Sequence, residues 1–415
     1  MLLSRTTNCS RAVQRVASVT LRNASNLLLA VDKNEINKTH ILDSELQPLQ
    51  ENEIRLKINK FALTSNTVTY GKIGTQFGYF DFYPYDPSAS TKPAPASSSW
   101  GYVPAIGWAS VVESKVSNIP TGGKYFGWYP MSQYCTVQAT PTQNGFRDIG
   151  KHRKENAHVY TEHIRADVDP FRDNNLIGNQ EEEDDYDDRQ AILRGLFLTS
   201  FLADEYFVDK ANYFGAKSVI IVSASSKTAL GIAQRIFDKN TVVPDDQRLH
   251  VIGVTSARNE AFVKSTGFYD QTVTYDSIGD DSICQNTAAV IIDMSGNWKV
   301  IQALHEHIGQ NIQYSMAIGL SHHDAGVAPK SLVLPGPSPT LFFAPSEVAR
   351  RLKEWGPKVF HQHSKEALTS FIGGSKSWME IQHVHGVSAV QREWLNAHDG
   401  NILPSVGMMA SMHEL

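Results

Sequence analysis

The fold of this chain is decided by residues 217–236, which read KSVIIVSASSKTALGIAQRI. The run Val219–Val222 consists of β-branched residues, a composition typical of a strand that is buried on both faces. Apolar residues then recur at helical spacing from Leu230 to Ile236. The short polar turn Ser223–Ser226 lies between them, so we predict a parallel strand that leads through a tight turn into a helix.

Such a turn is typical of an anion site, because the first N–H groups of a helix and the positive end of its dipole attract phosphate. We therefore predict that Ser225, Ser226, Lys227 and Thr228 bind the phosphate groups of a cofactor. The usual dinucleotide fingerprint has three glycines in this turn, whereas only Gly231 remains here. Taken alone, the turn leaves open an ordinary buried strand and helix joined by polar residues.

The chain that follows the turn favours the cofactor interpretation. Predicted strands and helices alternate, which indicates right-handed crossovers and a doubly wound parallel sheet. In such sheets ligands bind at the carboxyl ends of the strands, where this turn would lie. The predicted strands are 249–254, 272–275, 288–293 and 312–320, and the predicted helices are 259–266 and 298–307.

The end of the second strand bears on the choice of cofactor. Sites that prefer NAD place Asp or Glu there, whereas residues 254–258 contain no acid. A hydroxyl at Ser256 and a forked cation at Arg258 suit the 2′-phosphate of NADP. We therefore predict NADP, with Ser256 and Arg258 at its adenosine end. An Arg258 that is only a solvated residue in the first turn of a helix remains an alternative.

Length and composition limit the possible classes of protein. The 415 residues are enough for two domains, and the net charge of −5 comes without any basic stretch typical of nucleic-acid binding. No apolar run is long enough to cross a membrane. Three cysteines are too few for a disulfide framework or a cysteine-based zinc site. We expect a small-molecule substrate, with neither a nucleic acid nor a membrane as partner.

The first 31 residues contain no acid but carry Arg5, Arg11, Arg15 and Arg22. On a helix these arginines, except the first, would lie opposite an apolar side, as a mitochondrial import signal requires. We expect residues 1–25 to be such a presequence, or an N-terminal extension without that role. The predicted location is accordingly the mitochondrial matrix or the cytoplasm.

Residues 181–188, EEEDDYDD, hold seven acids. Because like charges repel one another, we predict an exposed acidic insertion near residues 180–190, and not a site for a divalent metal ion. Apolar residues at helical spacing from Arg189 to Tyr206 then predict a linker helix.

Five further segments carry a resemblance to a known family. They are Phe61–Tyr70, Gly78–Pro84, Trp100–Pro104, Phe126–Met131 and Glu354–Pro357. In these segments the chain resembles the medium-chain dehydrogenase/reductase superfamily, on its zinc-free quinone-reductase-like side. Within that side it is most similar to a branch known mainly as a domain of unknown function.

The resemblance implies an α/β fold with two domains. It places a β-rich, GroES-like substrate domain at residues 26–205 and a Rossmann-type nucleotide domain, with a doubly wound parallel sheet, at 206–345. The C-terminal segment, 346–415, would return to pack on the first domain. By the same analogy we expect a homodimer.

The resemblance also implies where the chemistry lies. Zinc enzymes of the superfamily have Gly-His-Glu where this chain has Gly107, Trp108 and Ala109, and their metal-binding cysteines are missing as well. Since catalytic zinc needs three protein ligands, we predict no zinc. Asn66 and Tyr70 match a stretch that lies beside the nicotinamide in quinone reductases. Tyr70 would donate a proton or a hydrogen bond there, or it is one more packed aromatic residue.

The predicted function is that of a zinc-free, NADP-dependent oxidoreductase acting on a quinone or an α,β-unsaturated carbonyl compound. The alternative is a non-catalytic nucleotide-binding or scaffold protein that retains the reductase fold, because one fold hosts many functions. An open apolar pocket around Tyr70, lined by aromatics such as Tyr79 or Phe82, would favour the enzyme. A filled site would favour the alternative.

Overall fold

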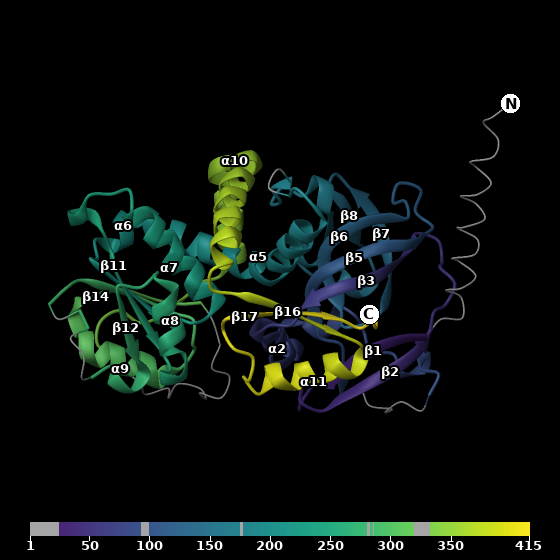
Figure 1. Cartoon of the computed structure of the whole chain (residues 1–415), viewed down its shortest axis with the longest axis horizontal. Helices are drawn as coiled ribbons and strands as arrows, with labels where there is room; N and C mark the ends of the chain where they lie inside the picture. Colours follow the sequence, from purple (N-terminus) through teal and green to yellow (C-terminus); the bar gives the residue numbers. More distant parts are fainter. Residues whose placement is uncertain (1–24, 93–98, 175–176, 280–282, 285, 319–332) are drawn as a thin grey trace. The chain divides into compact units, whose positions relative to one another are not determined.

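The computed structural model describes residues 25–92, 99–174, 177–279, 283–284, 286–318 and 333–415 (Figure 1). The proposed presequence therefore lies, except for its last residue, outside the described residues. The chain folds into two compact units. Unit 1 contains the described residues up to Asp169, together with Gln382–Ile402 and Met408–Leu415, and unit 2 contains Pro170–Ile381 and Leu403–Gly407.

Unit 1 is built around antiparallel strands. A small sheet has the order β2-β1-β4, and a larger one has the order β16-β17-β3-β5-β6-β9-β8-β7, with an additional pairing between β3 and β7 that closes a barrel. The small sheet consists of β1 (Ser25–Asp32), β2 (Thr39–Glu45) and β4 (Trp100–Gly101). The larger sheet consists of β3 (Glu53–Ala62), β5 (Pro104–Ser114), β6 (Gly122–Pro130), β7 (Tyr134–Thr142), β8 (Gly145–Asp148), β9 (Glu162–Arg165), β16 (Glu380–His385) and β17 (Val406–Ser411).

The barrel encloses an apolar core. Leu56 and Ile58 of β3, Trp108 of β5 and Phe146 of β8 are all fully buried. Helices of this unit are α2 (Ser65–Lys72), α3 (Gly74–Phe77), α4 (His158–Thr161) and α11 (Val387–His398). The predicted β-rich first domain is thus confirmed as a fold.

Unit 2 contains a six-stranded sheet of order β12-β11-β10-β13-β14-β15, in which every pairing is parallel. Numbered from its first strand, this order is 3-2-1-4-5-6, the arrangement of a dinucleotide-binding fold. The predicted doubly wound sheet is confirmed. Its strands are β10 (Ser218–Val222), β11 (His250–Thr255), β12 (Gln271–Thr274), β13 (Ala289–Asp293), β14 (Ile312–Ala317) and β15 (Thr340–Leu341).

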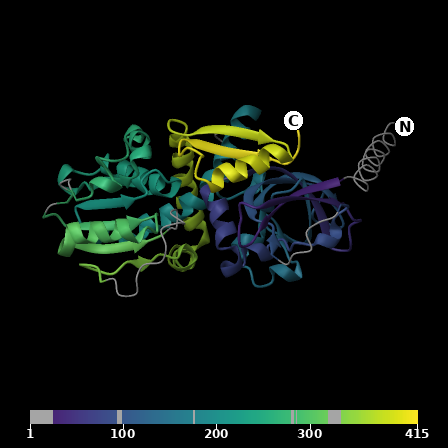
Figure 2. The ribbon, with the colours of Figure 1, turned by 90° about the horizontal axis from the view of Figure 1, so that it is seen from below.

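Helices cover both faces of this sheet (Figures 1 and 2). Val219 and Ile221 of β10 pack with residues of α5 (Gln180–Asp209) and α7 (Lys227–Asn240) on one face. Ile220 and Val222 point to the opposite face, where they join residues of α9 (Trp298–Ile308). The continuous β-branched run is explained by this two-sided burial. The remaining helices of unit 2 are α6 (Ala211–Phe214), α8 (Glu260–Thr266) and α10 (Ala344–Ser375).

The acidic run is not the exposed loop that its charge predicts. Residues 181–188 form the first turns of α5, which Asn179 caps by accepting from the Glu182 N–H at 3.0 Å. Acids at this end of a helix are favoured by its dipole. Basic partners offset the remaining repulsion: Arg172 pairs with Asp187, and Arg189 pairs with Asp185 at 2.9 Å. Tyr186, Asp187 and Asp188 are buried.

The two units do not follow the boundaries expected from the sequence. The predicted boundary at 205/206 falls inside α5, all of which belongs to unit 2. The C-terminal segment is divided, with α10 in unit 2 and α11 in unit 1. Gly356 has φ 75° and interrupts α10 just before Pro357, which explains the conspicuous Glu-Trp-Gly-Pro motif.

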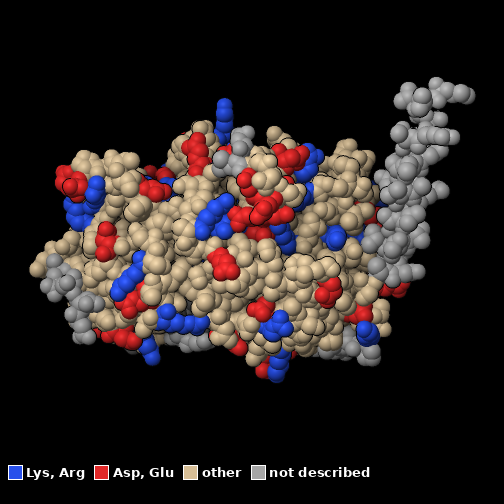
Figure 3. Space-filling model, in the orientation of Figure 1, with Lys and Arg blue, Asp and Glu red and all other residues tan. Residues whose placement is uncertain are grey.

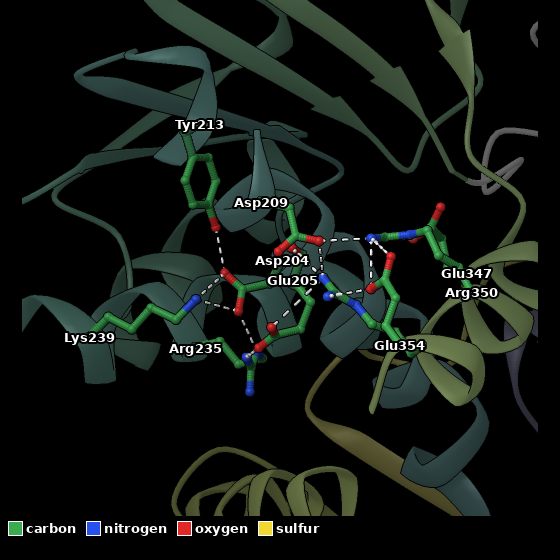
Figure 4. Close-up of polar contacts among 10 residues, drawn as sticks. Asp204, Glu205, Asp209, Tyr213, Arg235, Lys239, Glu347, Arg350 and Glu354 are labelled. Carbon is green, nitrogen blue, oxygen red and sulfur yellow. Dashed lines mark hydrogen bonds and ion pairs between the residues drawn. The ribbon is translucent and has the colours of Figure 1, made fainter. Parts of the chain in front are cut away.

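A buried ionic cluster joins α5 to α7 (Figure 4). Asp204 accepts from the Tyr213 hydroxyl at 2.6 Å, from Arg235 Nε at 2.5 Å and from Lys239 Nζ at 2.6 Å. Burial alone would raise the pKa of Asp204, but Arg235 and Lys239 outweigh it and hold that pKa below its ordinary value. We call Asp204, Tyr213, Arg235 and Lys239 the Asp204 cluster.

Charges on the face drawn in Figure 3 are mixed in sign, and the coloured, described residues form no large continuous basic surface there. In the part of the chain that the structure describes, no helix combines the length and the apolar character needed to cross a membrane. The expected binding partners and the expected location in the cell stay predictions.

Candidate functional site

The β10–α7 turn of unit 2 is formed without glycine. Ser223, directly after β10, has φ 60°, a left-handed conformation that usually favours glycine. The Ser226 N–H donates to the Ser223 carbonyl at 2.9 Å, and Ser226 Oγ caps α7 by accepting from the Ala229 N–H at 3.3 Å. The chain thus makes a tight strand-to-helix turn with serines in place of glycines.

The predicted cofactor residues from two strands meet at one edge of the sheet. Val222 and Val254 are paired in register, and the Ala224 N–H donates to the Val254 carbonyl at 3.1 Å. This brings the turn close to the segment that begins with Ser256. Ser256 is half-buried, and Arg258 is exposed in the short 3-10 helix Ala257–Asn259.

Lys227 does not extend freely into solvent. It is the first residue of α7, and its ammonium donates to the carbonyls of Pro404 at 3.3 Å and Val406 at 3.0 Å. Burial lowers the pKa of Lys227 to about 8. Thr228 is half-buried, and its carbonyl accepts from Ser200 Oγ at 2.7 Å. Lys227 therefore keeps its cation beside the β10–α7 turn, and Thr228 belongs to the first turn of α7 at the same place.

Gly231, the one glycine left from the fingerprint, serves helix packing. A Cβ at this position would lie 2.6 Å from Ser200 Oγ and 3.1 Å from Phe197 Cδ2, both on α5. Since real Cβ atoms do not approach this closely, the contact between α7 and α5 requires glycine here.

Two further features of this edge were not found from the sequence. Asn259 Nδ2 donates to Ser225 Oγ at 3.0 Å, across 34 positions of the chain. Asp293, the last residue of β13, is buried and accepts from the Ser295 N–H at 2.7 Å and the Gly296 N–H at 3.1 Å. Burial raises the pKa of Asp293. An acid at the end of an apolar strand was the available signal for Asp293, whereas no local pattern marks Asn259.

In unit 1, Asn66 and Tyr70 lie one helical turn apart on α2, where Thr64 forms a capping box with Thr67. Asn66 Nδ2 donates to the Tyr70 hydroxyl oxygen at 3.4 Å. The i,i+4 spacing in the sequence is what brings the two side chains together. Burial raises the pKa of Tyr70 far above its ordinary range, so the phenol keeps its proton.

Tyr70 belongs to a group of five packed aromatic rings. Its ring centroid lies 4.7 Å from that of Tyr79 and 5.1 Å from that of Trp128. Phe82 and Tyr160 complete the group, with centroids 5.2 Å apart. The sequence marked Tyr79 and Phe82 as candidates, but Tyr160 comes from α4 and no spacing pattern connects it to the others.

The position that holds zinc ligands in related enzymes is filled by a buried aromatic side chain. Trp108 of β5 is fully buried and meets Phe126 edge-on, with ring centroids 5.3 Å apart. In the described ranges, no three His, Cys, Asp or Glu side chains gather so that they could hold a metal ion. The expectation that zinc is absent remains a prediction.

A model of the family described as "Protein of unknown function (DUF2855)" matches residues 61–402. The chain belongs to this family. The predicted membership in a branch of unknown function is therefore confirmed. No curated protein matches the sequence of this chain.

Solved structures share the fold of this DUF2855 chain. CurA from Vibrio vulnificus, in complex with NADPH, is 12% identical, with a TM-score of 0.58, and the match covers 94% of this chain and 100% of CurA. The mitochondrial 2-enoyl thioester reductase Etr1p/Etr2p heterodimer from Candida tropicalis is 12% identical, with a TM-score of 0.53 and coverage of 94% and 100%. The Etr1p complex with NADP and crotonyl-CoA has a TM-score of 0.51, 12% identity and the same coverage. The expected medium-chain reductase fold is confirmed.

Proposed function

We propose that this chain is a zinc-free, NADP-dependent oxidoreductase that reduces an α,β-unsaturated carbonyl compound or a quinone. The observation that carries the proposal is the carboxyl edge of the parallel sheet in unit 2. There a glycine-free turn presents two serine hydroxyls at the N-terminus of α7, beside a strand end that carries Ser256 and Arg258 and no acid.

The residues of this edge fit the phosphate groups of NADP. Ser225 and Ser226 would bind the diphosphate, with the backbone of Thr228 and the positive charge of Lys227 behind them. Ser256 and Arg258 would bind the 2′-phosphate, because a forked guanidinium complements a dianion. When bound, the cofactor supplies a hydride to the substrate. Two neighbours of the same fold are described as complexes with NADPH or NADP, which supports this choice.

Tyr70 and Asn66 would act on the substrate. Since Asn66 donates to the Tyr70 oxygen, the phenol hydrogen is left to donate elsewhere, and burial keeps that hydrogen in place at neutral pH. A neutral phenol of this kind can hydrogen-bond a carbonyl oxygen and stabilise the charge that develops on it during reduction. The neighbour described as a 2-enoyl thioester reductase supports a conjugated carbonyl substrate, and its heterodimer supports an oligomeric assembly.

The test is a titration of the purified protein with NADPH and NADH, followed by the melting temperature, which a ligand of the native state must raise. We expect NADPH to bind more tightly than NADH. Arg258→Ala should remove most of this difference, which we estimate at about tenfold for a single charge-assisted contact. The control is Lys264→Ala, an exposed lysine of the neighbouring helix α8, which should leave the preference unchanged. Failure of both nucleotides to bind would refute the proposal.

A non-catalytic nucleotide-binding protein is the second candidate. The observation in its favour is the close packing of Tyr79 and Trp128 around Tyr70, which is the arrangement of a filled site. The same preparation separates the two candidates when NADPH absorbance is followed with crotonyl-CoA and with a benzoquinone. Binding of NADPH without its oxidation by either acceptor would favour the second candidate.

A further inference from the structure

Ser225 and Ser226, two of the three serines in the β10–α7 turn, each have a hydroxyl oxygen that already accepts a hydrogen bond from the protein. Ser225 Oγ accepts from Asn259 Nδ2 at 3.0 Å, and Ser226 Oγ accepts from the Ala229 N–H at 3.3 Å. A hydroxyl has one hydrogen to donate and two positions at which to accept. When an N–H occupies an accepting position, the hydroxyl hydrogen turns toward another group. Each of these hydroxyl hydrogens is thereby available to a group other than the donor that its oxygen accepts from.

Ser225 is the more constrained of the two. It is 92% buried in unit 2, so solvent contributes little to its orientation, whereas Ser226 is half-buried. Its partner Asn259 follows β11 and lies directly after Arg258. An amide N–H is a fixed donor and cannot accept from the serine through that atom. Asn259 therefore keeps the Ser225 hydroxyl hydrogen from pointing toward its own amide nitrogen.

A second hydrogen bond occupies an acceptor of the same turn, the Ala224 carbonyl oxygen. The Tyr269 hydroxyl donates to the Ala224 carbonyl at 2.8 Å, so the negative end of this peptide is directed at the phenol. Gly253 of β11 makes room for that ring, because a Cβ there would lie 2.8 Å from Tyr269 Cδ1 and 3.0 Å from the Ala224 Cβ. The Ala224 carbonyl oxygen thus has a partner within the protein, which reduces its repulsion of an anion bound at the turn.

We propose that Asn259 is a positioning residue that holds the Ser225 hydroxyl as a hydrogen-bond donor to the diphosphate of a bound dinucleotide. This inference rests on the proposed function. In a glycine-rich turn, backbone N–H groups approach the diphosphate closely. Here the Cβ atoms of the turn keep its backbone N–H groups farther from the diphosphate. We infer that the Ser225 hydroxyl donates to a phosphate oxygen in their place. On this proposal, the Asn259–Ser225 hydrogen bond compensates for the missing glycines of the turn.

The decisive variant is Asn259→Asp, which keeps the shape of the side chain but replaces the donor by an acceptor. The Ser225 hydrogen would then point to the carboxylate of the variant, and a negative charge would lie near the phosphate. We expect NADPH to bind at least about tenfold more weakly to Asn259→Asp than to the wild type. Asn259→Ala should weaken binding less, since it frees the hydroxyl without reversing it.

The relative NADPH affinities of Asn259→Asp and Asn259→Ala distinguish a residue that positions the Ser225 hydroxyl from one that only stabilises the fold. A residue that only stabilised the turn would be replaced better by Asp, which still hydrogen-bonds the serine, than by Ala. We therefore expect Asn259→Asp to resist urea at least as well as Asn259→Ala while it binds NADPH less well. Gln247→Glu, at an exposed position of the same unit, adds the same charge and should bind as the wild type does.

Inorganic pyrophosphate, as a second probe, separates this inference from the proposed function. If the wild type binds NADPH and Asn259→Asp binds it as well as Asn259→Ala does, the inference is overturned while the proposed function stands. If the wild type binds pyrophosphate but not NADPH, with the expected order of variants, the inference stands and the proposed cofactor is wrong. If neither probe binds the wild type, both are wrong.

Discussion

The two ends of α7 hold their lysines in opposite ways. Lys239, in the last turn, lies against the carboxylate of Asp204 and at the end of the helix where the dipole favours a cation. Lys227, at the first residue, lies where the dipole opposes a cation, and it donates to two backbone carbonyls. The pKa of Lys227 falls to about 8 as a consequence of burial.

This difference separates a structural end of the helix from the end at which we propose that a ligand binds. Charges in the Asp204 cluster are paired: the fully buried Asp204 carboxylate accepts from Arg235 and from Lys239, whose side chain is 38% exposed. At the turn, a cation and two oriented hydroxyls gather beside the first N–H groups of the helix, an arrangement that is more stable with an anion present. We therefore expect the paired charges at the C-terminal end to stabilise the fold at neutral pH, and the buried charge of Lys227 at the N-terminal end to lower stability until the lysine loses its proton.

The largest effect is expected from Asp204→Asn. Removal of the carboxylate leaves Arg235 and Lys239 facing each other without their common partner, and breaking a buried ion pair in this way costs about 3 to 5 kcal/mol. Urea unfolding of the variant at pH 7 measures this loss. The matched control is Asp245→Asn, whose pair with Arg248 is exposed and should contribute little.

The pH dependence gives the same prediction an independent check. Because the pKa of Asp204 is lower in the folded state, its contribution is present above the ordinary value of 3.8 and is lost as the pH falls through the folded value. The deficit of Asp204→Asn should therefore shrink in acid. A deficit under about 1 kcal/mol at pH 7 would show that the cluster does not hold the helices together.

A smaller effect, at higher pH, is expected at Lys227. Since its folded pKa of about 8 lies below the ordinary 10.5, the unfolded chain binds the proton more tightly between these values, and stability rises with pH across that window. The free energy of unfolding of the wild type, relative to Lys227→Met, should rise on the order of 3 kcal/mol between pH 8 and 10.5. Urea unfolding at several pH values measures it.

Lys239→Met is the control for this comparison. Its ammonium is paired with Asp204, so its loss should destabilise the protein at pH 7. A relative stability of wild type and Lys227→Met that stays flat from pH 8 upward would contradict the assigned burial of the Lys227 charge.

The smallest effect is expected from Tyr213→Phe. This change removes the hydroxyl that donates to Asp204 at 2.6 Å and leaves Arg235 and Lys239 in place. A single hydrogen bond to a charged acceptor contributes about 1.5 to 3 kcal/mol, and the retained partners should keep the loss near the lower value. The double variant Asp204→Asn with Tyr213→Phe should cost less than the two changes summed, since both act on one carboxylate. An additive result would contradict the coupling.

Local sequence patterns correctly predicted those features that depend on a single strand or helix. The β-branched run Val219–Val222 predicts a strand buried on both faces, and the sheet places it at its centre. The spacing of Asn66 and Tyr70 predicts two side chains on one side of a helix, and they are in contact. The exposed insertion predicted for residues 181–188 was wrong. Two basic partners of these acids, Arg172 and Lys376, come from outside the helix that the acidic run begins, and no local pattern marks them.

The sequence by itself determined the order of strands and helices, the parallel sheet and the edge at which its polar residues gather. These features follow from periodicity and from the handedness of crossovers, which are local or nearly local. Only the tertiary structure decided that Lys227 turns to the carbonyls of Pro404 and Val406 and that Asn259 reaches Ser225. A side chain takes its direction from the partners that folding brings to it, and these partners lie far away along the chain.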